Sequence, residues 1–486
     1  MRYANVLHAL GWLIAVIGIA MALPLLVAMA FEEKEAARAF VIGGALAGFS
    51  GGGLIVAFRG VSGQLSRAHT LLLLVLGWTV LPIFAAFPFA FLGAPSGSTS
   101  SYFEAVSGLT TTGATLLSGQ LDNLPKALLV WRAGLQWLGG LGTITVAVVM
   151  LAPLGIGGME LRRSPLARGD TTSLIARLRQ TASQVIGVYG ALTFLCFGFI
   201  WVGGVPGFDA FCLALSTIST GGFLPRDGNI DAYQAPLSAF ILCLAMIIGG
   251  LSFAAHRAAF RGSLEEYRLD PEVGYLAAFI LILGALLSLT IFFETGSGQS
   301  ALTTGYFLSI SLATTTGFMA GSEAQLASVP PVLALGAVLI GGATLSTAGG
   351  LKLMRLALMF KQAGRELKRL AHPHGIISTK YGNRAVELAT MKDVWIFFIL
   401  FLASFVLVTI VVSASGIGMQ ASMGAAAAAL SNTGPAYDIL RASVDEAVPY
   451  AQFPVLAKWA LSAAMILGRV EILAVLSLFN IAYWRS

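Results

Sequence analysis

The chain has 486 residues, of which 57% are hydrophobic and only 11% are charged. Because soluble domains carry about 25% charged residues, this composition excludes a soluble protein and indicates an integral membrane protein. The formal net charge of +6 comes from basic residues scattered between apolar segments, which suits cytoplasmic loops and argues against a nucleic-acid partner.

The first two apolar stretches predict membrane-spanning helices, from about Val6 to Ala28 and from about Phe40 to Phe58. The sequence Ala28-Met29-Ala30 after the first stretch has the small residues of a signal-peptide cleavage site. The length of that stretch and its weakly charged start favour a retained helix over a signal peptide.

The rest of the chain repeats one unit four times, at a loose period of roughly 100 residues. Each unit consists of a span, a short apolar segment, a strand of Thr or Ser ending in Gly, and a second span. The four strands are Thr110–Ala114, Ile218–Gly222, Thr314–Phe318 and Asn432–Ala436.

The short apolar segments predict half-length helices that enter the membrane and end at the strands. These segments are Tyr102 to Leu109, Phe208 to Thr217, Ser300 to Ala313 and Met419 to Ser431. The flanking spans are predicted near Leu71–Phe91, Leu128–Leu151, Val185–Val202, Leu237–Ala255, from Val273 onward, Val332–Phe360, Trp395–Ser413 and Val455–Phe479. We therefore expect an all-α membrane protein with roughly ten spans and four re-entrant helices.

The predicted boundaries follow from this repeat. The two N-terminal helices occupy residues 1–68, and the four pore repeats occupy 69–180, 181–270, 271–392 and 393–486.

Non-helical backbone within the membrane is tolerated only where protein or a water-filled cavity surrounds it. Glycine lets successive carbonyls turn the same way, and four such loops around one axis form an oxygen ring that can replace the water around a cation. We expect the glycines at 113, 221, 317 and 434 to be equivalent, with Pro435 making the fourth loop different. The candidate cation-binding residues, mainly through backbone carbonyls, are Thr111, Thr112, Gly113, Ser219, Thr220, Gly221, Thr315, Thr316, Gly317, Asn432, Thr433 and Gly434.

With these strands the chain resembles the TrkH/KtrB/HKT superfamily of potassium transport proteins, most closely the TrkH type. The resemblance also covers Phe103–Leu109, Leu135–Gly142, Leu154–Met159 and Leu467–Ile472. It implies potassium uptake through a channel-like pore in the bacterial inner membrane. In that superfamily, glycine in all four loops goes with potassium, whereas serine in the first goes with sodium.

The resemblance further implies a homodimer, with one pore in each protomer, bound to a cytosolic nucleotide-binding subunit of the TrkA type. The basic segment from Lys361 to Lys392 is a candidate docking surface, and a solvated cytoplasmic loop explains it equally well. Potassium is the cargo, membrane lipid is the surrounding partner, and no organic cofactor is expected.

A run of small, helix-poor residues inside the predicted span Val332–Phe360 should break that helix below the filters. In the resembled superfamily this segment is an intramembrane loop that blocks the pore and moves to open it. A small-residue face packed against a neighbouring helix is the alternative. The candidate gating residues here are Gly341, Gly342, Thr344, Ser346, Thr347, Gly349 and Gly350.

Arg469 is the last candidate gating residue, because a charge within a span usually faces a cavity or a partner. The resemblance places it beside the pore below the filters. The alternative is a side chain that extends to the cytoplasmic interface. Glu471 lies two residues away on another helix face, so an ion pair between the two is not expected.

The loops on one side of the membrane each carry a cluster of basic residues. By the positive-inside rule both termini then lie in the cytoplasm and the filters open to the outside. The clusters include Arg162, Arg163, Arg168, Arg177, Arg179, Arg257, Arg261, Arg268, Lys361, Arg365, Lys368, Arg369, Lys380, Arg384, Lys392 and Arg485.

Two other functions remain as alternatives. A proton- or sodium-coupled secondary transporter, such as a symporter, would need carboxylates within its spans, and few acids occur there. A membrane-embedded enzyme would need a catalytic motif such as HExxH or GxSxG, and the sequence has neither. The chain is therefore expected not to be an enzyme.

Overall fold

The structure, a computed structural model, describes residues 2–60, 66–151, 174–372, 379–382, 384–444 and 447–478. In this part of the chain nearly all secondary structure is helical, apart from a small antiparallel pair of strands, β1 (Lys380–Tyr381) and β2 (Arg384–Ala385). The segment Leu154–Met159 and the basic residues at 162, 163, 168 and 485 lie outside the described residues.

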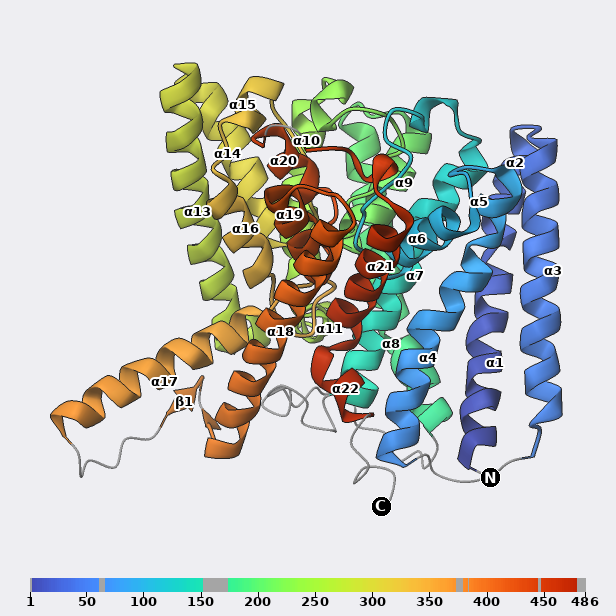
Figure 1. Cartoon of the computed structure of the whole chain (residues 1–486), viewed down its shortest axis with the longest axis horizontal. Coiled ribbons are helices and arrows are strands. Elements are labelled where there is room, and N and C mark those ends of the chain that lie inside the picture. Colours follow the sequence, from blue (N-terminus) through green and yellow to red (C-terminus); the bar gives the residue numbers. More distant parts are fainter. Residues whose placement is uncertain are drawn as a thin grey trace.

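The predicted N-terminal hairpin is confirmed and forms one edge of the molecule (Figure 1). Helix α1 (Arg2–Ala20) continues as α2 (Ala22–Ala30), and α3 (Lys34–Ala57) returns beside it. Glycines allow close packing here, because a Cβ added at Gly51 would lie 2.7 Å from the carbonyl oxygen of Gly11.

Four repeats follow the hairpin, each with a first span, a pore helix and a second span. Repeat one comprises α4 (Arg67–Ala85), α5 (Phe87–Leu92), pore helix α6 (Ser98–Leu109), η1 (Leu121–Asn123), α7 (Lys126–Val146) and the π-turn η2 (Ala147–Leu151). Repeat two comprises α8 (Leu174–Val202), pore helix α9 (Gly207–Ile218), η5 (Ile230–Tyr233), α10 (Pro236–Gly250), α11 (Phe253–Phe260) and α12 (Glu265–Leu269).

Repeats three and four keep the same order. Repeat three comprises α13 (Pro271–Thr295), pore helix α14 (Gly298–Ala313), α15 (Glu323–Ala327), α16 (Pro331–Ile340) and α17 (Leu353–Ala371). Repeat four comprises α18 (Leu388–Ala414), pore helix α19 (Met419–Leu430), α20 (Ala436–Ala442), η6 (Tyr450–Gln452), α21 (Val455–Val470) and α22 (Ile472–Ser477).

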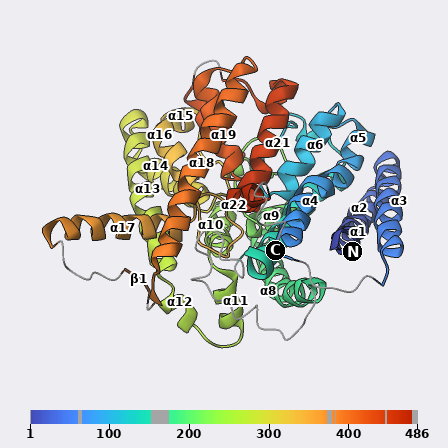
Figure 2. The same cartoon turned by 60° about the horizontal axis from the view of Figure 1, so that its bottom comes forward.

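The sequence predicts roughly ten full-length spans. In the structure, the second spans of repeats two, three and four are shorter or more bent than predicted. Seven described helices are long and apolar enough to cross a membrane, and α10 with α11, bent by 104°, would make an eighth. Helix α16 has 10 residues and α21 has 16. The expected break in the span Val332–Phe360 is present, but α17 does not continue that span. It projects sideways from the bundle, on the side away from α1–α3 (Figures 1 and 2).

The four repeats form a closed ring. The second span of each repeat packs against the pore helix of the next: α7 against α9, α10 against α14, α16 against α19, and α21 against α6. The last contact joins repeat four to repeat one. The pore helices therefore surround one axis, and their C-terminal halves are buried at its centre.

Candidate functional site

The strand after each pore helix begins with the same backbone geometry. The second residue after the end of each pore helix is left-handed in all four copies: Thr111 (φ 52°), Thr220 (φ 50°), Thr315 (φ 56°) and Asn432 (φ 53°). The amide of the following residue then donates to a carbonyl five residues back in the pore helix. These bonds, of 2.8–2.9 Å, join Thr112 to Ser107, Gly221 to Ser216, Thr316 to Ser311 and Thr433 to Ala428.

This geometry corrects the predicted alignment of the second loop by one residue. Gly222, with φ 83°, occupies the position of Gly113 (φ 78°) and Gly317 (φ 83°). Gly221 instead stands where the other loops have threonine. The sequence alignment matched the first glycine of the pair, whereas the left-handed turn at Thr220 sets the register.

The four loops touch one another around the axis. A Cβ at Gly113 would lie 2.0 Å from the oxygen of Gly221, and a Cβ at Gly222 would lie 2.1 Å from the oxygen of Thr316. Both positions therefore require glycine.

The ring closes through the fourth loop, which differs from the others as expected. The amide of Gly434 donates to the oxygen of Thr112 over 2.5 Å. Pro435 packs against Gly317, where a Cβ would lie 2.9 Å from the proline Cδ. Gly434 itself is not left-handed.

The left-handed residue of each loop supplies a buried carbonyl that has no hydrogen-bond partner in the described part of the chain. Neither these four oxygens, of Thr111, Thr220, Thr315 and Asn432, nor those of Gly113, Gly222 and Gly317 accept a hydrogen bond there. In contrast, the oxygen of Gly221 accepts one from Gln136 Nε2 at 2.7 Å. Buried carbonyls are rarely left unpaired, so two rows of free oxygens suit a site for a dehydrated cation.

Below the loops, residues 341–352 form an irregular segment that we term the intramembrane loop. Thr347 at its centre is fully buried and donates to the carbonyl of Gly249 over 3.0 Å. Its hydroxyl also accepts from Thr220 Oγ1 at 3.1 Å, and the amide of Gly349 donates to Thr315 Oγ1 at 2.7 Å. The intramembrane loop thus fills the axis beneath the filter loops.

Close packing, and not flexibility alone, explains the glycines of the intramembrane loop. A Cβ at Gly349 would lie 1.9 Å from the oxygen of Ser431 in the fourth filter loop. A Cβ at Gly341, where φ is 74°, would lie 2.1 Å from the oxygen of Gly349. The candidate gating residues Gly342, Thr344 and Ser346 are also buried in this segment, and Gly350 (φ 76°) closes it.

Charged side chains from repeats three and four hold the intramembrane loop in place. One carboxylate oxygen of Glu272, at the start of α13, accepts from the amides of Thr344 (2.9 Å) and Met354 (3.1 Å). Lys352 donates to the carbonyl of Ala348 within the loop, and Arg469 Nη1 donates to the carbonyl of Thr347 at 2.8 Å.

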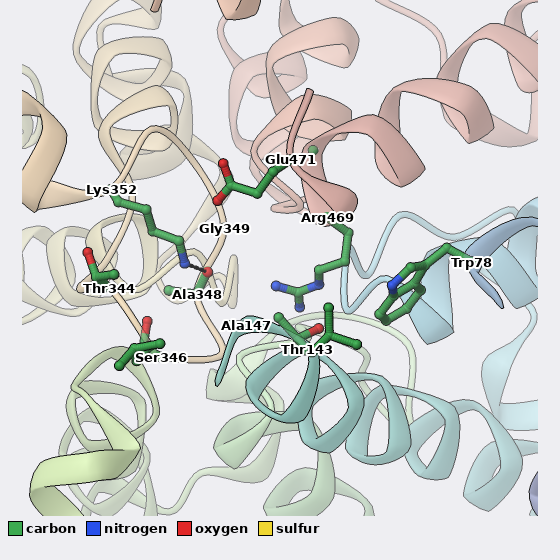
Figure 3. Close-up of a pocket in the computed structure, with 13 residues that line it drawn as sticks. Trp78, Thr143, Ala147, Thr344, Ser346, Ala348, Gly349, Lys352, Arg469 and Glu471 are labelled. Atoms are coloured by element: carbon green, nitrogen blue, oxygen red, sulfur yellow. Dashed lines mark hydrogen bonds between the residues drawn. The ribbon is translucent and has the colours of Figure 1, made fainter. Parts of the chain in front are cut away.

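Arg469 faces the loop and does not extend to the interface, because it is only 5% exposed. Its side chain points into a cavity of about 30 Å³ between the loop, Thr143 of α7 and Trp78 of α4 (Figure 3). Its Nε and Nη2 have no partner among the described residues. A cavity of this size holds about one or two water molecules.

Sequence reasoning missed the pairing of several charged residues. Glu471 does not pair with Arg469, as expected, but with Arg355 of α17, at 2.7 Å and with both side chains buried. Glu104 in the first pore helix pairs with Arg132 of α7 at 3.0 Å. In the sequence, these pairs are indicated by charged residues that lie within apolar segments.

The fold and the site define a membrane protein in which four re-entrant helix–loop units surround a single axis that an irregular segment closes. This architecture defines a membrane transport protein for cations. Comparison with known sequences shows that the chain belongs to the TrkH family, described as a cation transport protein, which it matches over residues 36–266 and 277–484. The predicted superfamily is thus confirmed.

Relatives match the chain over its full length. The Trk system potassium uptake protein TrkH of Salmonella typhimurium is 36% identical, and that of Escherichia coli K12 is 35% identical, with 100% of each chain covered. The crystal structure of the potassium transporter TrkH from Vibrio parahaemolyticus superposes with a TM-score of 0.89 at 32% identity, covering 100% of both chains. The expected fold class and the classification as a transporter and not an enzyme are confirmed.

Proposed function

We propose that this chain takes up potassium through a channel-like pore. The backbone carbonyls of the four loops that follow the pore helices, the filter loops, select the ion. The relatives that match its full length are described as potassium uptake proteins. The observation that carries the proposal is the ring of left-handed residues, with free carbonyl oxygens at Thr111, Thr220, Thr315 and Asn432.

Selection would arise because these oxygens replace the water around a dehydrated ion. The pore helices end at the loops, and the negative ends of their dipoles favour a cation there. Each loop carries one glycine at the equivalent position, so the filter is short. We therefore expect weak discrimination against rubidium and moderate discrimination against sodium.

The intramembrane loop would act as the gate. It occupies the axis beneath the filter and bonds to loops two and three through Thr220 and Thr315. Opening requires these bonds and the contact of Arg469 with Thr347 to break. Removal of the segment from Thr344 to Ala348 should accordingly raise basal flux.

A coupled transporter remains the second candidate function, but the buried acids give it little support. Glu272 accepts backbone amides of the intramembrane loop, and Glu471 pairs with Arg355. Both acids are thus engaged in holding the gate region together, which favours a channel-like mechanism over proton or sodium coupling.

We further propose that the protein works as a homodimer in the bacterial inner membrane, with both termini cytoplasmic and a TrkA-type cytosolic subunit controlling the gate. Helix α17 is suited to transmit such control, since it begins where the intramembrane loop ends. The helix projects from the bundle and exposes Phe360, Leu367 and Leu370.

The filter is tested by potassium uptake in a transport-deficient host and in proteoliposomes, with Gly113→Ser and Gly222→Ser. Each added side chain collides with a neighbouring carbonyl, so we expect potassium uptake, or its preference over sodium, to fall by at least about tenfold. The matched control is Gly119→Ser, since Gly119 has φ 80° but no atom within 4 Å of an added Cβ. Unchanged ion preference in both filter variants would contradict carbonyl selection.

A further inference from the structure

A buried ion pair lies behind the first filter loop. Glu104, in the middle of pore helix α6, is 0% exposed, and Arg132, in α7, is 1% exposed. The carboxylate Oε1 and the guanidinium Nε lie 3.0 Å apart. Burying a charge at this depth in the membrane costs free energy. A buried ion pair here therefore indicates a role beyond stabilising the fold.

Both charged groups hold the strand that leaves the first filter loop. Glu104 Oε1 accepts from Thr115 Oγ1 at 2.8 Å, and its other oxygen accepts from the amide of Leu116 at 3.0 Å. Arg132 Nη2 donates to the same threonine hydroxyl at 2.9 Å. These bonds fix the strand two and three residues beyond Gly113.

Arg132 also reaches the corresponding strand of the second loop. Its Nη1 donates to the carbonyl of Leu224 at 3.2 Å, and its guanidinium carbon lies 4.1 Å from the ring centroid of Phe223. One turn further along α7, Gln136 donates to the oxygen of Gly221 and accepts from the amide of Phe223 at 3.3 Å. One face of α7 therefore holds loops one and two together.

The contacts nearest to loops three and four are neutral among the described residues, and the carboxylate of Asp231, which accepts from the amide of Gly321 further along the strand that leaves loop three, lies at an exposed site. In repeat three, Ser311 Oγ donates to the carbonyl of Phe318 at 2.7 Å. In repeat four, Tyr450 OH donates to the carbonyl of Gly434 at 3.2 Å. Charge-assisted bonds are about twice as strong as neutral ones, so loops one and two form the stiffer half of the ring.

We propose that Glu104 and Arg132 are positioning residues for ion selection, which fix the spacing between filter loops one and two. This inference rests on the proposed carbonyl filter. With the pair intact, the oxygens of Thr111 and Thr220 keep the separation that favours potassium. When the pair is broken, the two loops relax independently and smaller or larger cations are coordinated nearly as well.

The test measures permeability ratios for potassium over sodium and over rubidium in proteoliposomes. Glu104→Gln should lower discrimination by about threefold to tenfold. Thr115→Val keeps the ion pair but removes the hydroxyl that joins it to the strand, so it should lower discrimination by about twofold to threefold.

Stability is measured in parallel by thermal unfolding, to separate positioning from folding. The double variant Glu104→Gln with Arg132→Met removes both charges and should recover much of the stability lost in Glu104→Gln, but not the selectivity. The matched control is Glu33→Gln. Glu33 accepts the amides of Lys126 and Ala127 at the start of α7, away from the filter, so its loss should not change the ratios.

The proposal is overturned if Thr115→Val and the double variant, both folded, keep wild-type ratios. It is also overturned if Glu33→Gln lowers the permeability ratios as much as Glu104→Gln does, because selectivity would then depend on the general stability of α7. If Glu104→Gln does not fold, Thr115→Val decides. Failure of the carbonyl filter itself would appear separately, as unchanged ratios in Gly113→Ser.

Discussion

Three threonines hold a backbone conformation that β-branched residues rarely adopt. Thr111, Thr220 and Thr315 have φ between 50° and 56°, and the fourth equivalent residue is Asn432. Residues in such regions cost about 1–3 kcal/mol each and persist only where their surroundings hold them. Here the amide of each left-handed residue and the amide of the next residue donate to carbonyls of the preceding pore helix, which fixes the turn.

Asparagine tolerates the left-handed conformation better than threonine does, so Thr111→Asn should relieve strain. The hydroxyl of Thr111 has no partner among the described residues, and no bond is lost. We expect the free energy of unfolding to rise by about 1 kcal/mol. Thermal unfolding of the purified protein measures the change.

The control is Thr303→Asn, on an exposed and regular turn of α14, which should bring no gain. A lower unfolding temperature for Thr111→Asn would contradict the assignment of strain to this position.

The intramembrane loop, which we propose as the gate, is an irregular element held by hydrogen bonds to its neighbours. Thr347 bonds to the ends of α9 and α10 and to Thr220 of the second filter loop. Thr347→Val removes these bonds without changing the shape of the side chain much. Since each is worth about 1 kcal/mol net, the closed state should weaken by about 1–2 kcal/mol and basal flux should rise about fivefold to thirtyfold.

Rubidium tracer flux into proteoliposomes without a regulatory partner measures this effect. Thr303→Val is the matched control, because Thr303 bonds only to its own helix in the described structure. Flux at or below the wild-type level in Thr347→Val would show that this loop is not the gate.

The pair Arg355–Glu471 links α17 to the break between α21 and α22. Because removing one partner leaves an uncompensated buried charge, Arg355→Met and Glu471→Gln should each destabilise the protein by about 3–5 kcal/mol. The combined variant should lie much closer to wild type, and thermal unfolding distinguishes these cases.

The exposed pair Arg38–Glu35, with both side chains more than 70% exposed, supplies the control. Arg38→Met should cost less than about 1 kcal/mol. A combined variant as unstable as the sum of the single ones would show that the two residues act separately.

Local patterns predicted the elements well and the contacts between them poorly. The Thr-Gly strands, the half-length helices and the helix break near Gly341 depend on residues adjacent in sequence, so the sequence contained them. The register of the second loop depends on where α9 ends, which a pair of glycines cannot show. Arg355 and Glu471 are 116 residues apart, and only the tertiary fold brings them together.

For the whole molecule, the four repeats act as a unit because each second span packs on the next pore helix. Helices α21 and α6 close that ring between the last repeat and the first. The charged residues are not distributed with the same symmetry. The ion pair Glu104–Arg132 stiffens the half formed by repeats one and two, whereas the intramembrane loop arises from repeat three alone.

Anomalous diffraction from crystals containing thallium, a monovalent ion that replaces potassium, tests the central claim most directly. We expect a peak on the axis, at coordinating distance from the carbonyl oxygens of Thr111, Thr220, Thr315 and Asn432. A map with no peak inside this ring, or with peaks only at side-chain carboxylates elsewhere, would contradict it.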